Sequence, residues 1–164
     1  MTINFRQNQI LFFLIFASAF ALLLAYISQY FFGLQPCNLC LYERKPFFAV
    51  IAICLLILVF FREKKAKKFA IFLSMFFLLI NAAIAIYHTG IEKKIFKLSE
   101  SCNSTIPENY NSIEELKQLI AHAPLARCDE PQFFFLGLSM ASWNIFYCLG
   151  LFVTTLFLHR KTKS

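Results

Sequence analysis

The chain has 164 residues, of which 59% are hydrophobic and 22 are phenylalanine, and it carries a formal net charge of +7. A soluble domain of this length could not bury so much apolar surface, so the composition excludes an ordinary soluble globular protein. Binding of nucleic acid would need a continuous basic face on a soluble scaffold. Here the cations lie in short segments between long apolar runs, which argues against that class.

Four apolar runs are long enough to cross a membrane, since a transmembrane helix needs about 20 predominantly apolar residues. They extend over Ile10 to Phe32, from about Leu41 or Pro46 to Phe61, Phe69 to Tyr87, and Phe133 to Leu158. None alternates polar with apolar residues as a membrane-spanning strand would. We therefore predict an all-α membrane protein, one domain over residues 1–164, built as a four-transmembrane-helix bundle with helices at about 10–32, 41–61, 69–87 and 133–158.

The first run could in principle be a cleaved signal peptide, because it follows a short segment that carries Arg6. Its uninterrupted apolar stretch is longer than the roughly 7–15 residues of a signal-peptide core. It also ends in Tyr30, Phe31 and Phe32 and not in small residues. We predict a retained helix.

Basic residues indicate how the bundle is oriented. Segments 1–9, 62–68 and 159–164 hold nine Lys or Arg in 22 residues, whereas 33–45 and 88–132 hold seven in 58. By the positive-inside rule the first set is cytoplasmic. Both termini should then be cytoplasmic, and the two outer loops should be 33–45 and 88–132.

Four of the six cysteines fall in these outer loops, namely Cys37, Cys40, Cys102 and Cys128. Disulfides persist in oxidising compartments outside the cytosol, so cysteine placement and charge agree on the topology. Cys54 and Cys148 lie inside the second and fourth apolar runs. There a free thiol behaves as a small hydrophobe, and we expect both to be structural.

The longer outer loop contains two short helical patterns. Residues 91–98, "IEKKIFKL", place apolar and lysine side chains on opposite faces, as in a helix lying at the membrane interface. Residues 111–124, "NSIEELKQLIAHAP", carry Ser112 and Glu115 at capping-box spacing, with Pro124 as a stop. We predict a surface helix at each.

The C-x-x-C at Cys37 and Cys40 is compatible with a metal site, a structural staple or a redox centre. A helix opening at Cys40 would place Arg44 on the same helical face, and a nearby cation lowers a thiol pKa, which favours Cys40 as the thiolate. Alternatively, Arg44 and Lys45 anchor the helix to lipid headgroups, with Glu43 offsetting the Arg44 charge. Pro46 either kinks a helix that begins near Cys40 or lies near the start of the main span.

Three motifs together resemble one family. "QPCNLCLYER" lies in the first outer loop, "SCNS" and "ARCDE" lie in the second, and "FLGLSMASWN" enters the fourth helix. In this order, over essentially the whole chain, they resemble the disulfide-bond formation protein B (DsbB) family, the thiol:quinone oxidoreductases of bacterial inner membranes. The resemblance implies an inner-membrane location, a quinone acceptor (ubiquinone or menaquinone) and a periplasmic thioredoxin-fold partner of the DsbA type.

The resemblance also implies roles for individual residues. Cys37 and Cys40 match the quinone-facing pair, with the Cys40 thiolate meeting the quinone ring, and Arg44 matches the arginine that stabilises developing negative charge. Cys102 and Cys128 match the shuttle pair: Cys102 takes a mixed disulfide with the partner, and Cys128 then exchanges with Cys37. These exchanges need no metal.

Two positions depart from the family, and one histidine has two interpretations. Glu92 stands where relatives often carry glutamine, and Arg127 precedes Cys128 where glycine or a small acidic turn is frequent. His88 lies at the outer end of the third helix, where family members often have histidine. The resemblance makes it a quinone contact, whereas the residues alone favour an interfacial ring bonded to backbone or water. We expect Trp143 to be a packing or interface aromatic.

Three other classes could use the same cysteines. A structural zinc site typically uses closely spaced ligand pairs, which Cys102 and Cys128 do not form. A disulfide-stapled scaffold gives no reason for a bridge within C-x-x-C, because so small a loop stabilises little by chain entropy. An enzyme like the vitamin K epoxide reductases should carry its C-x-x-C late in the bundle, and here it follows the first helix.

Overall fold

The computed structural model describes residues 2–97, 102 and 126–163. Within these ranges the long elements are helices α1 (Thr2–Tyr30), α2 (Asn38–Phe60), α3 (Lys64–Glu92) and α5 (Met140–Lys163). Strands β1 (Phe134–Phe135) and β2 (Leu138–Ser139) form a small antiparallel hairpin directly before α5. The described chain is therefore mostly helical.

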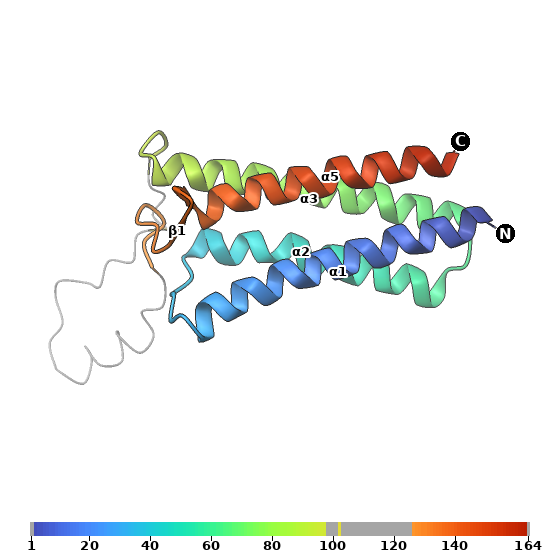
Figure 1. Ribbon diagram of the computed structural model, residues 1–164, viewed down its shortest axis with the longest axis horizontal. Helices are drawn as coiled ribbons and strands as arrows, with labels where there is room; N and C mark the ends of the chain where they lie inside the picture. The colour runs from blue at the N-terminus through green and yellow to red at the C-terminus, as the bar shows by residue number, and fades with distance from the viewer. Residues whose placement is uncertain (1, 98–101, 103–125, 164) are drawn as a thin grey trace, which may run out of the picture.

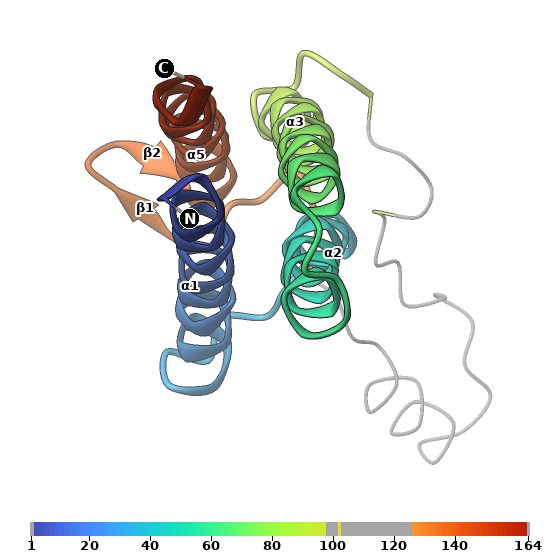
Figure 2. The same cartoon turned by 90° about the vertical axis from the view of Figure 1, so that its right-hand side faces the viewer.

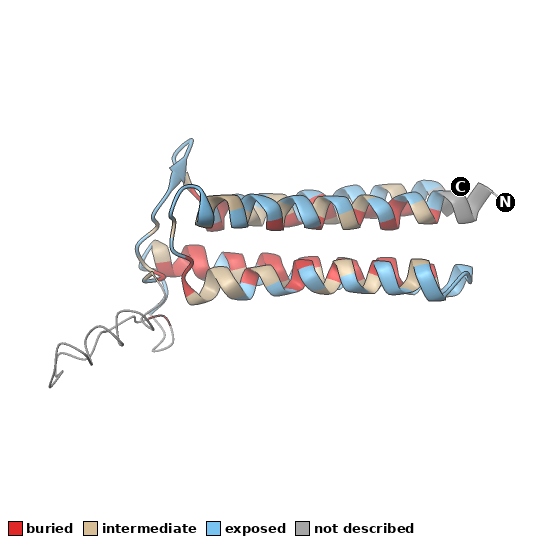
Figure 3. Ribbon diagram, turned by 90° about the horizontal axis from the view of Figure 1, so that it is seen from below, coloured by how far each residue is buried: buried red, intermediate tan, exposed pale blue. Residues whose placement is uncertain are grey.

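The four helices lie side by side in two layers, α1 with α5 and α2 with α3 (Figures 2 and 3). Both termini and the short α2–α3 connection lie at one end of the bundle, and the α1–α2 connection and the hairpin lie at the other (Figure 1). At the first end, Arg6 donates a hydrogen bond to the Lys161 carbonyl at 3.1 Å. The three basic segments therefore share one end, and the cysteine segments share the opposite end.

Three of the helices are long and apolar enough to cross a membrane, over Arg6–Tyr30, Lys64–Glu92 and Met140–Lys161. Helix α2 has 23 residues, which at roughly 1.5 Å per residue extend about 35 Å. Its first turns, however, carry Glu43, Arg44 and Lys45. Length thus suits a fourth span, and the charges set α2 apart from the other three helices.

Large apolar side chains cover the outer faces of the helices. Exposed examples include Phe16, Phe20, Phe60 and Phe76, and the buried residues line the space between the layers (Figure 3). Water would oppose so extensive an apolar exterior, whereas lipid accommodates it. The interior is a cluster of aliphatic side chains that includes Leu14, Val50, Ile71 and Leu78. Cys54 and Cys148 lie within this cluster, as expected.

Two helix starts differ from the sequence prediction. Helix α2 begins at Asn38 and contains Pro46, so the proline lies inside the helix and does not open it. Helix α5 begins at Met140, not at residue 133, because residues 134–139 form the hairpin. The hairpin turn places Leu136 at φ 52° and Gly137 at φ 76°, the backbone that a two-residue turn between paired strands requires. Because residues 134–139 are mostly apolar, the sequence pattern did not indicate a turn there.

The predicted interfacial helix over residues 91–98 is wrong for its described part. Helix α3 continues to Glu92, and residues 93–97 form turns. The chain reverses at Lys94, where φ is 58°, and the Phe96 N–H donates to the Gly90 carbonyl. Phe96 then stacks on Tyr87, with 5.5 Å between ring centroids. The second predicted surface helix, over 111–124, lies outside the described residues.

Candidate functional site

The first cysteine of the C-x-x-C caps α2. Because the helix begins at Asn38, Cys37 is the N-cap, and its sulfur accepts the backbone N–H of Cys40 at 3.2 Å. The two sulfur atoms lie 2.8 Å apart, and both cysteines are free thiols in this structure. The prediction had opened the helix at Cys40. With the observed start, the helix N-terminus stabilises negative charge on Cys37 instead.

Cys37 is the more readily ionised thiol in this arrangement. The hydrogen bond between the two sulfurs, helped by the Cys40 N–H, lowers the pKa of Cys37 below its usual value, against an opposing effect of burial. A thiolate is the species that attacks disulfides and other electrophiles. The structure therefore favours Cys37 as the thiolate, where the sequence had favoured Cys40.

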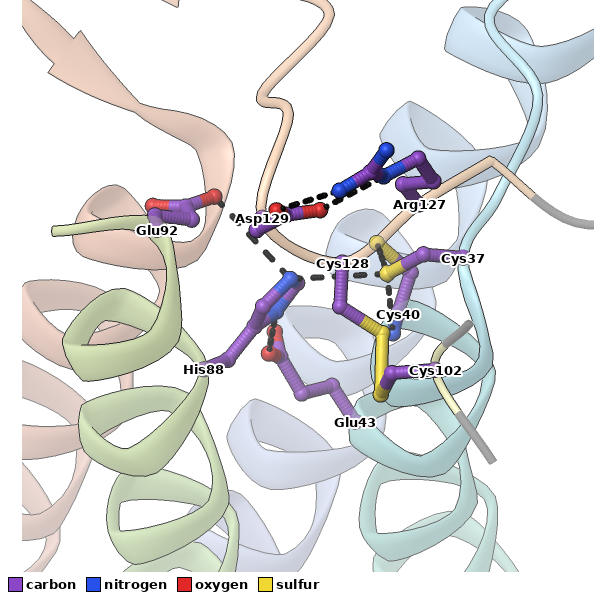
Figure 4. The surroundings of a disulfide bond; sticks show 9 residues. All are labelled: Cys37, Cys40, Glu43, His88, Glu92, Cys102, Arg127, Cys128 and Asp129. Atoms are coloured by element: carbon purple, nitrogen blue, oxygen red, sulfur yellow. Dashed lines mark hydrogen bonds and ion pairs between the residues drawn. A yellow bond between two sulfur atoms is a disulfide. The ribbon is translucent and has the colours of Figure 1, made fainter. Parts of the chain in front are cut away.

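The outer cysteines from the longer loop join the same site. Cys102 and Cys128 form a disulfide with 5.4 Å between their Cα atoms. Both are buried with Cys37 and Ile91 in one small cluster, against which Cys40 packs. An isolated parallel bridge between Cys37 and Ala126 holds the two loops together. All four cysteines predicted as redox-active thus meet at one end of the bundle (Figure 4).

His88 lies beside this cysteine cluster and contacts it directly. Its Nε2 is 3.4 Å from the Cys37 sulfur, and its Nδ1 is 2.7 Å from Glu43 Oε1 (Figure 4). The second carboxylate oxygen of Glu43 accepts a hydrogen bond from Asn144 Nδ2 at 2.7 Å. His88 and Glu43 are both buried. Three helices therefore contribute to one polar chain: α2 through Glu43, α3 through His88 and α5 through Asn144.

Glu43 and Asn144 were missed as site residues by sequence reasoning. The sequence paired Glu43 with Arg44, whereas the structure turns Glu43 toward α3 and Arg44 toward α1. The available signal was helical spacing: Glu43 follows Cys40 by three positions and so lies near it on one face of α2. Nothing local pointed to Asn144, which is 101 residues from its partner.

Arg44 is held by α1. Its Nη1 donates to Gln29 Oε1 at 2.8 Å, and its Nη2 donates to the Ala25 carbonyl at 3.4 Å. Its guanidinium carbon also lies 4.9 Å from the centre of the Tyr26 ring, within the range of a cation–π contact. These contacts fix a charge that cannot lose its proton at the cysteine end of the α1/α2 interface.

A cavity of about 630 Å³ adjoins the cysteine pair. Its walls come from all four long helices and the segment around Cys128, and they include Cys37, Cys40, Arg44, Phe20, Phe146 and Trp143. Trp143 donates to the Phe135 carbonyl at 2.9 Å, which ties the hairpin to α5. The volume lies within the roughly 300–1,000 Å³ of small-molecule sites, and the mostly apolar wall with few polar groups is typical of them.

The two residues that depart from the family pattern have defined contacts. Glu92 accepts a hydrogen bond from the Ser139 hydroxyl, and its Oε1 lies 3.9 Å from His88 Nε2. Arg127 makes two hydrogen bonds to Asp129, at 3.0 and 2.9 Å. The Arg127 guanidinium holds the pKa of the Asp129 carboxyl below its usual range. This pair clamps the turn that contains Cys128.

Three side chains at the site could also ligate a metal ion. The sulfur atoms of Cys37 and Cys40 and a ring nitrogen of His88 lie within 4.8 Å of one another. Two thiolates and an imidazole can bind Zn²⁺, and a carboxylate on the far ring nitrogen is a common support for such a ligand. This trio differs from the four-cysteine set considered from the sequence, in which Cys102 and Cys128 would have been ligands.

Long apolar helices, a free C-x-x-C pair and a neighbouring disulfide define a multi-pass membrane protein of the thiol–disulfide oxidoreductase class. The family model for disulfide bond formation protein DsbB matches residues 7–158. The chain belongs to the DsbB family, and its function is accordingly that of an oxidoreductase in disulfide-bond formation.

The chain is similar to two relatives named disulfide bond formation protein B and to one uncharacterized protein. An uncharacterized protein of Rickettsia prowazekii (strain Madrid E) is 32% identical, covering 100% of this chain and 98% of the relative. A disulfide bond formation protein B of Xanthomonas axonopodis pv. citri (strain 306) is 28% identical over 98% of this chain and 93% of its own length. One from Xylella fastidiosa (strain Temecula1) is 29% identical, over 73% of this chain and 70% of its own length.

Proposed function

We propose that this protein reoxidises a periplasmic dithiol oxidase of the DsbA type and passes the electrons to a membrane quinone, ubiquinone or menaquinone. The observation that carries the proposal is the gathering of two cysteine pairs in one buried cluster beside an apolar cavity. A lipid-soluble oxidant can reach such a cavity from the bilayer. A purely structural pair of disulfides would need no cavity and no arginine held at its wall.

The proposed topology places the cysteine end of the bundle at the periplasmic face of the bacterial inner membrane. The three basic segments at the other end then lie in the cytoplasm, as the positive-inside rule requires. Helix α2 is the fourth span in this proposal. Its charges lie in its first two turns, where Glu43 is hydrogen-bonded by α3 and α5 and Arg44 by α1, which offsets the cost of placing them near lipid.

Each transfer in the proposed route is a thiol–disulfide exchange that moves two electrons. A partner thiolate attacks Cys102, the Cys102–Cys128 bond breaks, and Cys128 leaves as a thiolate. Cys128 then attacks Cys37 of an oxidised Cys37–Cys40 pair and releases Cys40. The second thiolate of the partner attacks the partner–Cys102 bond, so the partner leaves oxidised and Cys102 is released as a thiolate. Cys102 then attacks Cys128 and releases Cys37, which restores the Cys102–Cys128 disulfide and leaves Cys37 and Cys40 as a dithiol. The exchange between Cys128 and Cys37 needs these two residues to meet, and the membership of both in one buried cluster supports it.

The quinone is the final electron acceptor in this proposal. The Cys37–Cys40 dithiol loses two electrons and two protons as its disulfide forms, and the quinone gains both as hydroquinone. Cys40 and Arg44 both line the cavity, so a thiol and a fixed positive charge face the space that a quinone ring would occupy. A cation at that position stabilises negative charge that develops on quinone oxygens.

Capture of the partner tests this function against the disulfide-stapled scaffold. In a Cys128→Ala variant Cys102 is a free thiol without its internal partner. Its thiolate should attack the disulfide of an oxidised thioredoxin-fold oxidase, release one partner cysteine as a thiol and remain attached to the other as a mixed disulfide. The adduct is visible on a non-reducing gel and disappears with reductant. A Cys102→Ala variant is the matched control and should form much less adduct. Absence of any adduct with thioredoxin-fold oxidases would favour the scaffold.

A further inference from the structure

The imidazole of His88 is contacted at both of its nitrogens. Glu43 lies 2.7 Å from Nδ1, and the Cys37 sulfur lies 3.4 Å from Nε2. The ring therefore stands between a carboxylate and a thiol, and all three side chains are buried. Figure 4 shows the same order, with Glu43, His88 and Cys37 in sequence. This arrangement is the general pattern of a nucleophile, a base and a group that orients the base.

Hydrogen bonding fixes which nitrogen carries the proton. Asn144 donates to Glu43 Oε2, and the other oxygen, Oε1, faces His88 Nδ1. An ionised carboxylate only accepts hydrogen bonds, so Nδ1 is the protonated nitrogen. The lone pair of Nε2 then points to Cys37.

We propose that Glu43 is a positioning residue that holds His88 as the base for Cys37. In the oxidation of the dithiol, the Cys37 S–H bond breaks and its proton passes to His88 Nε2. The sulfur is left as a thiolate, and Glu43 stabilises the resulting imidazolium through Nδ1. The use of this proton transfer during turnover rests on the proposed function, with the quinone taking up the two electrons and two protons. The transfer itself is a property of the reduced protein alone.

Two electrostatic effects of Glu43 oppose each other, and geometry decides between them. The carboxylate repels a thiolate directly, but the protonated ring lies between the two and is in contact with the sulfur. Glu43 Oε1 is 2.7 Å from His88 Nδ1, whereas the ring separates it from the sulfur. Because Coulomb energy falls with distance, the attraction of Glu43 for the imidazolium outweighs its repulsion of the thiolate. Removal of the Glu43 charge should therefore make Cys37 harder to ionise.

The other charged or titratable groups around His88 are few among the described residues. Cys40 lies on α2, and Glu92 on α3 is 3.9 Å from Nε2 with its carboxylate bonded by Ser139. Helix α5 contributes the neutral Asn144, and Asp129 is paired with Arg127. Glu92 thus provides a matched control: it is a second carboxylate near the same ring, with its side chain 9% exposed, but without a hydrogen bond to the ring.

The test measures alkylation of Cys37 in the fully reduced protein as a function of pH, with a chelator present and peptide mass mapping to separate Cys37 from Cys40. Neither quinone nor partner is required. We expect Glu43→Gln to slow Cys37 alkylation about tenfold at pH 7, with recovery as the pH approaches the ordinary thiol pKa of about 8.5. His88→Gln should give the same loss, and the double variant should lose no more, because the two residues act as one unit.

Two further variants make the outcome decisive. Glu92→Gln should change the Cys37 profile by less than about twofold. Glu43→Asp keeps the charge but moves it away from the ring, so its alkylation profile should lie between those of the wild type and Glu43→Gln. If the glutamine variant does not fold, Glu43→Asp is compared with the wild type in its place. Alkylation of Glu43→Gln at the wild-type rate or faster, as direct repulsion alone predicts, would overturn the inference.

The result is separable from the proposed function. If the Glu43 variants shift the alkylation profile while the wild-type protein reduces no quinone, the proposed acceptor is wrong and the role of Glu43 stands. If quinone is reduced normally and the profile does not move, the acceptor stands and the role of Glu43 is wrong.

Discussion

The two ends of the bundle differ in how their buried polar side chains are hydrogen-bonded. At the cysteine end, Cys37, His88, Glu43 and Asn144 form one connected hydrogen-bonded chain across three helices. Toward the other end, the side-chain oxygens of Gln7 and Thr155 are buried without a hydrogen-bond partner among the described residues. The first group involves α2, α3 and α5, and the second involves α1 and α5. The difference lies in whether the polar groups are linked to reactive atoms.

This contrast shows which buried polar residues to associate with chemistry. Small hydroxyl residues such as Ser18, Ser74 and Thr155 allow close approach of helices and are common at packed interfaces in membranes. A buried carboxylate is far more costly unless it is hydrogen-bonded or paired, and Glu43 has both oxygens occupied. Its position beside the thiols therefore associates the Glu43 carboxylate with their chemistry.

The largest expected effect is on quinone reduction, and it distinguishes Cys40 at the cysteine end from Cys54 in the interior of α2. Cys40→Ser removes a thiol that lines the cavity, so quinone reduction driven by a reduced partner should fall roughly a thousandfold or more, since no disulfide can form with Cys37. Cys54→Ala, in the buried interior of α2, should retain the wild-type rate. The loss of quinone absorbance measures both. Wild-type turnover by Cys40→Ser would contradict the assignment of Cys40.

A smaller effect is expected at Arg44. Arg44→Met loses two hydrogen bonds to α1 and the positive charge at the cavity wall. A hydrogen bond from this cation to a charged quinone oxygen contributes roughly 1.5–3 kcal/mol in the proposed transfer, so kcat/KM for quinone should fall about ten- to a hundredfold. Arg160→Met, an exposed arginine at the opposite end, is the control and should leave kcat/KM unchanged. An unaltered kcat/KM in Arg44→Met would indicate that Arg44 only anchors α2.

The smallest effects concern stability and compare one polar residue from each region. Asn144→Leu leaves a buried Glu43 oxygen without its donor, which should cost roughly 1–3 kcal/mol. Thr155→Val replaces a hydroxyl that has no hydrogen-bond partner among the described residues, and should change stability by about 0.5 kcal/mol or less. Thermal unfolding in detergent measures both. Equal destabilisation by the two variants would remove the distinction between the two ends.

Much of the architecture could be predicted from residue patterns, because lipid imposes a strict length and polarity on each helix. The apolar runs located all four helices, and the C-x-x-C and the loop cysteines identified the thiols that the structure gathers. Helix ends were less accurate. Helix α5 starts at Met140 because Leu136 and Gly137 adopt a tight turn. The apolar pattern of the sequence did not indicate this turn.

The polar chain at the site could not be predicted, because its members come from three helices. Glu43 is 45 residues from His88 and 101 from Asn144, and no local period links such positions. The sequence therefore assigned Glu43 to its neighbour Arg44. Packing of α2 against α3 and α5 decided otherwise, since it turned the two side chains toward different helices.

The most direct test of the central claim is a single turnover without partner protein. Protein with Cys37 and Cys40 as thiols and the Cys102–Cys128 disulfide intact, as in this structure, is mixed anaerobically with one equivalent of quinone, and quinone absorbance is followed while the disulfides are mapped by mass spectrometry. The proposed electron transfer predicts loss of about one quinone per protein with matching formation of a Cys37–Cys40 disulfide. Formation of that disulfide without loss of quinone, or an unchanged dithiol in the presence of quinone, would contradict it.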